Sequence, residues 1–123
     1  NELYKGILAG KSKAVFNGRI VVHKDAQKTD SEQANRNLVL SDKATINTKP
    51  ELVIFADDVS CAHGATVGQL DADSIFYLRA RGIPEIVAKK MLVEAFLEEA
   101  LSQLPLESVK TEVMKIISKS NTL

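Results

Sequence analysis

The stretch "VGQLDADSIFYLRARGIP", residues 67–84, marks the point where the chain changes from strand-like to helix-like sequence. Asp71 is a residue type favoured as the N-cap of a helix, and apolar residues then recur at helical spacing. Gly82 lies where a helix commonly ends in a left-handed residue, and Pro84 suits the first turn of a following helix. The stretch therefore predicts a boundary between two structurally different parts.

The part after this boundary, residues 69–123, is predicted to hold three helices. The second helix ends at about Gln103, and the third follows Pro105 with apolar residues at three- and four-residue spacing. The second helix carries more apolar residues than one contact face needs, so we expect two of its sides to be buried. These residues are Ile86, Val87, Met91, Leu92, Val93, Ala95, Phe96, Leu97, Ala100, Leu101 and Leu104.

The part before the boundary, residues 1–68, carries short apolar or alternating runs separated by turn residues, which predicts β-strands. The segment His23–Asn37 is long and polar, and we expect it to be a connection over the surface. The runs have no fixed period, so the pattern fits both a β-sandwich and the irregular turns of a β-solenoid. The runs are Leu3–Leu8, Ala14–Val22, Asn37–Leu40, Ala44–Ile46 and Leu52–Ala56.

Composition and charge exclude several classes of protein. The 16 basic residues balance 16 acidic ones, so no net field attracts nucleic acid or an anionic membrane. No apolar run approaches the ~20 residues of a membrane-spanning helix. The single cysteine cannot form an internal disulfide, which indicates a reducing compartment, and we expect a cytoplasmic protein. The chain begins without an initiator Met and reads as a segment of a longer polypeptide.

Cys61 and His63 are the residues with the clearest chemical potential. In a strand they lie on one face, about 6.6 Å apart along the chain, which is close enough to bind one metal ion or cluster from one side. A structural zinc or an iron–sulfur cluster needs about four protein ligands, however, and the chain holds one Cys and two His. Two interpretations remain: a buried thiol beside a hydrogen-bonded histidine, or a half-site that a partner completes.

Two other motifs do not fit their usual chemistry. The stretch "GILAGKS", Gly6–Ser12, has three residues between its first glycine and the Gly-Lys pair, whereas a phosphate-binding loop needs four. Ser60 and His63, with Asp57 or Asp58, are the residue types of a hydrolase triad, but they fall within seven consecutive residues. Triads bring their groups together from separate elements. We therefore expect neither a nucleotide site nor a serine hydrolase.

The stretch "ANRNLVLSDKATINTKPELVIFADDVSCAHGATVGQLDADSIFYLRARGI" resembles the C-terminal part of the SufB/SufD family of iron–sulfur cluster assembly proteins. The motifs "NTKPEL", "ADDV", "HGATVG" and "FYLRARGI" occur in the family's order, and the resemblance covers essentially the whole chain. The Cys-x-His-Gly-Ala-Thr stretch is similar to the SufD branch.

The resemblance implies a right-handed parallel β-helix, of which residues 1–68 are the last turns, followed by a small α-helical bundle. It also implies a non-catalytic scaffold subunit that pairs with a SufB-like subunit and binds a SufC-like ABC ATPase through its helices. His63, with Cys61 as its companion, would form a metal or cluster half-site at the subunit interface. A transient iron–sulfur cluster or iron is then expected in the full complex, and none in the isolated segment.

The helical part is expected to provide the ATPase contact, because the second helix has more apolar surface than its own bundle can cover. The isolated segment is expected to form at least a dimer, because a β-helix cut before its first complete turn exposes backbone donors and acceptors at that end. The residues expected at the ATPase contact are Arg81, Gly82, Ile83, Pro84 and Leu97.

Two other functions compete with the scaffold. A β-solenoid could act on or bind carbohydrate, but such sites use aromatic platforms, and the chain has no Trp and 5% aromatic residues. A redox protein could use Cys61, but no second cysteine is present to resolve a disulfide.

Overall fold

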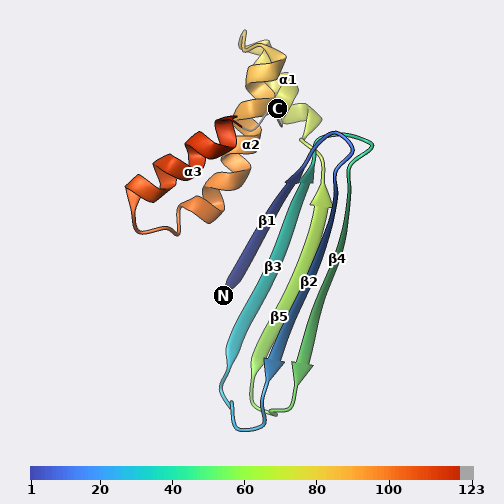
Figure 1. Ribbon diagram of the computed structural model, residues 1–123, viewed down its shortest axis with the longest axis vertical. Coiled ribbons are helices and arrows are strands. Elements are labelled where there is room, and N and C mark those ends of the chain that lie inside the picture. The colour runs from blue at the N-terminus through green and yellow to red at the C-terminus, as the bar shows by residue number, and fades with distance from the viewer. Residues whose placement is uncertain (120–123) are drawn as a thin grey trace. The chain divides into compact units, whose positions relative to one another are not determined.

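The computed structural model describes residues 1–119, which divide into two compact units (Figure 1). The first unit, Asn1–Gly68, contains all the strands, and the second begins at Gln69 and contains the helices. The sheets and the helices are therefore described separately.

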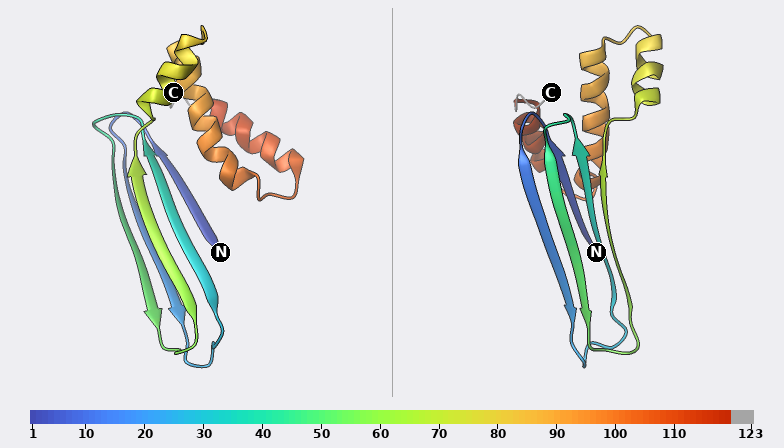
Figure 2. Two further views of the ribbon diagram at one scale, coloured as in Figure 1. Left: turned by 180° about the vertical axis from the view of Figure 1, so that it is seen from behind. Right: turned by 90° about the vertical axis from the view of Figure 1, so that its right-hand side faces the viewer.

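Five strands make up the first unit, and they form two parallel sheets of three and two strands. Successive strands lie in alternate sheets, because the strand orders are β1-β3-β5 and β2-β4 (Figure 2). Strands of the two sheets contact each other and enclose an interior. The strands are β1 (Glu2–Leu8), β2 (Lys13–Val22), β3 (Asp30–Val39), β4 (Thr45–Ile54) and β5 (Ser60–Gly68).

The expected right-handed parallel β-helix is wrong. The strands of residues 1–68 form two separate sheets that do not close into a coil, and with three helices the chain has a small α/β fold. The segments that connect successive strands explain why no third sheet forms between the two sheets of residues 1–68. They are tight turns closed by local bonds, such as the Ala26 N–H to the His23 carbonyl at 2.9 Å and the Ser12 N–H to the Ala9 carbonyl at 3.2 Å.

The expected surface connection at His23–Asn37 is also wrong, because its second half belongs to β3, the central strand of the larger sheet. The inner face of β3 carries three buried amide side chains, Gln33, Asn35 and Asn37. The pattern of apolar residues does not reveal a strand whose buried residues are polar. The predicted runs Ala44–Ile46 and Leu52–Ala56 likewise fall mostly within one strand, β4, which extends from Thr45 to Ile54.

The buried amides are partly satisfied by each other and by the neighbouring strands. The Asn37 Nδ2 donates to the Asn35 Oδ1 at 2.7 Å and to the Thr66 carbonyl oxygen at 3.2 Å. The Gln33 Nε2 donates to the Glu2 Oε2 at 2.8 Å. Beside them, Leu8, Val39 and Ala44 form an apolar cluster. The interior is therefore polar along the middle of β3 and apolar at the strand's end.

Two glycines make room for these amides. A Cβ added to Gly18 would lie 2.3 Å from the Gln33 Oε1, and one added to Gly6 would lie 2.5 Å from the Asn37 Oδ1. Both separations are shorter than non-bonded contacts allow. Any side chain at either glycine would displace a buried amide from its hydrogen bonds.

The second unit holds α1 (Ala72–Ala80), α2 (Glu85–Leu101) and α3 (Glu107–Lys119). The predicted N-cap is confirmed, since the Asp71 side chain accepts a hydrogen bond from the Ser74 N–H at 2.9 Å. The predicted helix end is confirmed at Gly82, whose φ is 84°, and the Ile83 N–H donates to the Leu78 carbonyl at 3.3 Å. These local signals fix the turn between α1 and α2.

We predict that Gly18→Ala lowers the free energy of unfolding by about 1–3 kcal/mol, because the added methyl overpacks the interior and displaces the Gln33 amide. Urea denaturation of the purified protein measures this change. Gly64→Ala is the matched control, since a Cβ there meets nothing within 4 Å. Equal stability of the two variants would contradict the steric role of Gly18.

Candidate functional site

β5 brings Cys61 and His63 together on one face of the three-stranded sheet. In the parallel register, Cys61 lies beside Ser31 and His63 beside Gln33 of β3. Register partners share a face, so both side chains start from the face that carries the buried amides. Cys61 is half-buried and His63 is exposed, so the geometry differs from a buried thiol beside a core histidine.

β5 is an edge strand, because within residues 1–119 it pairs on one side only, with β3. The strand is nine residues long. It contains no Asp, Glu, Lys, Arg or Pro, and His63 is its one histidine. Its residues from Ala62 to Gly68 are exposed, and Gly64 and Gly68 have open space around them. Edges that stay free are usually protected by charge, proline or bulges, so this edge is suited to accept another strand.

The chain by itself does not complete a metal site. Within residues 1–119 no group of three or more His, Cys, Asp and Glu side chains could hold a metal ion. Cys61 and His63 therefore offer one sulfur and one imidazole donor, and any further ligands must come from outside the described chain.

The predicted ATPase-contact residues lie between and on the first two helices. Arg81 places its guanidinium carbon 3.5 Å from the centre of the Tyr77 ring. Gly82, Ile83 and Pro84 form the turn, and Pro84 is the N-cap of α2. Leu97 lies within α2 and is half-buried, so it is a poor representative of the exposed surface.

Exposed apolar side chains of the helical unit lie on all three helices, with Ile116 of α3 63% exposed. Phe76 is 74% exposed and Ile86 61% exposed, and Tyr77, Val87 and Met91 are exposed as well. We expected Ile86, Val87 and Met91 to be buried, and we did not single out Phe76 or Tyr77. The signal in the sequence was the adjacent aromatic pair Phe76 and Tyr77, which stands between the half-buried Ile75 and Leu78 on the short helix α1.

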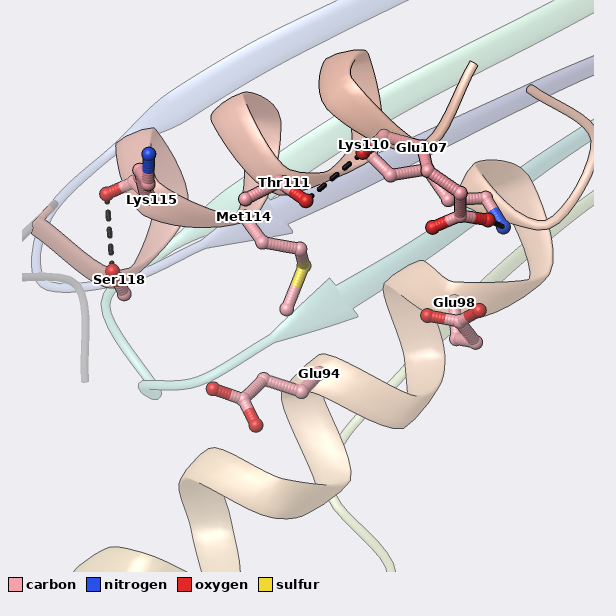
Figure 3. Close-up of a pocket in the computed structure, with 8 residues that line it drawn as sticks. All are labelled: Glu94, Glu98, Glu107, Lys110, Thr111, Met114, Lys115 and Ser118. Atoms are coloured by element: carbon pink, nitrogen blue, oxygen red, sulfur yellow. Dashed lines mark hydrogen bonds and ion pairs between the residues drawn. The ribbon is translucent and has the colours of Figure 1, made fainter. Parts of the chain in front are cut away.

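A groove of about 480 Å³ separates α2 from α3 (Figure 3). Glu94 and Glu98 line it from α2, and the α3 side includes Lys110, Met114 and Lys115. The charged groups already pair along their own helices: Lys110 with Glu107 at 2.9 Å, Lys115 with Glu112 at 3.4 Å and Lys90 with Glu94 at 4.0 Å. The groove therefore offers no concentrated charge to a ligand.

The comparisons with known proteins identify the family. The model of the family "SUF system FeS cluster assembly, SufBD core domain" matches residues 1–96. The chain belongs to the SufBD family. The family predicted from the sequence motifs is thereby confirmed.

Named relatives agree with this assignment. The chain is 50% identical over 118 residues to an iron–sulfur cluster assembly SufBD family protein of Synechocystis, covering 96% of the chain and 26% of the relative. It is 46% identical over 118 residues to the iron–sulfur cluster assembly protein SufD of Escherichia coli, covering 96% and 28%. It is 40% identical over 112 residues to the chloroplastic protein ABCI7 of Arabidopsis thaliana, covering 90% and 24%. The chain thus spans about a quarter of the length of these relatives.

Across residues 1–119, no helix combines the length and apolar character that a membrane crossing requires. One relative is named as chloroplastic. The cytoplasmic location stays a prediction.

We predict a pH dependence for the start of α1. Hydrogen bonds from Ser74 hold the pKa of Asp71 below its usual value. Their stabilisation is fully present above the unfolded pKa of about 3.9 and is lost as the pH falls through the lowered folded value. Helicity followed by circular dichroism should therefore fall at acid pH, and fall less in Asp71→Asn, which keeps an N-cap oxygen without titrating. Parallel acid curves for the two proteins would exclude this contribution.

Proposed function

We propose that the chain is part of a SufD-like scaffold subunit of a Suf-type iron–sulfur cluster assembly complex. The observation that carries the proposal is β5, a free, uncharged strand edge that bears an exposed imidazole and a half-buried thiol on one face. Membership of the SufBD family supports it. The role is non-catalytic: the subunit supplies ligands and contact surfaces.

The free edge of β5 pairs with a SufB-like subunit. Its unpaired backbone N–H and carbonyl groups provide the affinity, and its small residues let another backbone approach closely. Gly64 and Gly68 fit this role because no atom lies within 4 Å of a Cβ placed on either.

His63 is the ligand that the chain contributes to the nascent cluster, with Cys61 as its companion. The cluster is the cargo of this complex and leaves it after assembly. Two donors from one chain bind too weakly to retain it, and the facing subunit supplies the rest. Incomplete ligation from each side favours release to an acceptor protein.

The helical unit binds a SufC-like ABC ATPase. The turn residues Arg81 to Pro84 lie between α1 and α2, and exposed apolar side chains of both helices lie on either side of the turn in sequence. Exposed apolar groups gathered on a small unit commonly mark protein contacts. The half-buried Leu97 contributes to this unit mainly through packing.

We predict that His63→Ala abolishes cluster formation in the full complex while the subunits still assemble, because the variant removes a ligand and leaves the β5 backbone unchanged. Cys61→Ser should do less harm. Iron and sulfide counted in complexes of the full-length protein, with size-exclusion chromatography as the assembly control, give the readout. Normal cluster formation in His63→Ala would remove the half-site from the proposed function.

We predict that Phe76→Ser weakens binding of a SufC-like ATPase by about tenfold or more, the usual effect of removing an aromatic anchor from an interface. Val15→Ser is the matched control, because Val15 is 68% exposed but lies on β2 of the other unit. Calorimetric titration of the full-length variants measures both affinities. Equal losses, or none, would place the ATPase contact elsewhere.

No observation favours the alternative of a carbohydrate-acting or carbohydrate-binding β-solenoid. The chain has no Trp, its exposed Phe76 and Tyr77 lie on a helix, and the exposed Tyr4 of β1 has its ring centre 4.9 Å from that of Phe16.

A further inference from the structure

Arg81, the C-cap residue of α1, has its side chain held in one orientation by its own helix. Its guanidinium carbon lies 3.5 Å from the centre of the Tyr77 ring, and its Nη1 donates to the Tyr77 carbonyl oxygen at 3.4 Å. Both contacts are to the residue four positions earlier, which is a neighbour on the helix surface. The guanidinium group therefore has a defined position although Arg81 is exposed.

The positive charge of Arg81 has no carboxylate partner within residues 1–119. Glu85, the nearest acidic residue in sequence, is already engaged through both oxygens, with the Arg79 Nη1 at 3.3 Å and the Lys89 Nζ at 2.7 Å. A hydrogen bond from Lys89, with the charges of Lys89 and Arg79, lowers the pKa of Glu85. The charge of Arg79 is therefore neutralised, whereas that of Arg81 is not.

The guanidinium of Arg81 keeps most of its hydrogen-bond donors available. An arginine has five N–H donors in a planar fork, and a carboxylate matches two of them at once. A phosphate commonly gathers several separate donors, such as a group of backbone N–H groups. One ordered guanidinium on a helix that also exposes Phe76 therefore fits a single carboxylate on a protein surface better than a phosphate.

We propose that Arg81 determines the specificity of the ATPase contact by binding one Asp or Glu carboxylate on the ATPase surface, with Tyr77 as its positioning residue. This inference rests on the proposed function, because it names the chemistry that the partner offers beside α1. Tyr77 holds the long side chain in its binding orientation, so less rotamer freedom is lost on association. Charge complementarity of this kind selects the correct partner more than it adds affinity.

The charge of Arg81 is tested by calorimetric titration of full-length variants with a SufC-like ATPase. Arg81→Gln should weaken binding roughly tenfold, the effect of losing a charge-assisted hydrogen bond. Arg81→Lys keeps the charge but loses the planar fork, and should weaken binding about threefold. The matched control is Arg79→Gln on the same helix, which should change the affinity less than about twofold because Glu85 already pairs with Arg79. Equal losses in Arg81→Gln and Arg79→Gln would overturn the proposal.

The positioning role of Tyr77 is tested in the same assay. Tyr77→Leu removes the ring that holds the guanidinium, and should weaken binding about threefold. Tyr77→Phe keeps the ring and should weaken binding less than Tyr77→Leu. In the Arg81→Gln background, Tyr77→Leu should cause no further loss, because the two residues act as a unit. Additive losses would overturn the positioning role.

Charge reversal tests whether the partner group is a carboxylate. Arg81→Glu should abolish binding, and one ATPase variant with a single surface Asp or Glu replaced by Lys should restore it. Circular dichroism verifies that each variant is folded. The absence of any rescuing variant, or a loss in Arg81→Gln that appears only when ATP is bound, would overturn the carboxylate.

The two levels of inference fail in different ways. Normal binding by folded Arg81→Gln would overturn the role of Arg81 and leave the proposed ATPase contact in place. If the unchanged full-length protein bound no SufC-like ATPase, the ATPase contact and the role of Arg81 would both be overturned.

Discussion

The sheet unit depends on the accommodation of amide side chains inside it. Burying an amide without a hydrogen bond costs about 1–3 kcal/mol, and β3 buries three of them in alternate positions. Glu2, Asn35 and the Thr66 carbonyl accept from the amide nitrogens, and Gly6 and Gly18 provide the space. A one-residue slip of β3 would turn these amides outward and bring Glu32 and Arg36 inward. The amides therefore determine the register of β3, and the register in turn places Cys61 and His63.

The sequence predicted the helical unit better than the sheet unit, for a physical reason. Asp71 and Gly82 act within a few residues of their own position, through a cap hydrogen bond and a positive φ. The pairing of β3 with β5 joins residues about 30 positions apart, such as Gln33 and His63. No local signal encodes such pairing. In addition, the buried side chains of β3 are polar, so the apolar pattern did not reveal β3 as a strand. The closed β-helix failed because the short connections form turns and not additional strands.

Residue spacing singled out Cys61 and His63, which alternate as expected on a strand, whereas the interpretation as a half-site came from the family resemblance. Their surroundings could not be predicted, because exposure depends on β5 being an edge and the neighbour of His63 depends on the register. For the helical unit, the sequence pattern does not show which apolar residues are exposed. Apolar residues such as Ile86 give one pattern whether they pack in a core or face a partner, and only the packed structure shows that Ile86 is exposed.

In the proposed scaffold, the free edge of β5 combines two functions that most metal sites separate. A strand that pairs along β5 supplies backbone hydrogen bonds, and its own side chains then lie beside Cys61 and His63 because register partners share a face. Partner binding and completion of the ligand set thus become one event. The edge of β5 carries no charged side chain or proline that would prevent another strand from pairing with it. The same sequence therefore allows non-specific strand pairing, and hence aggregation. That risk is consistent with a strand whose function begins only when a second strand covers it.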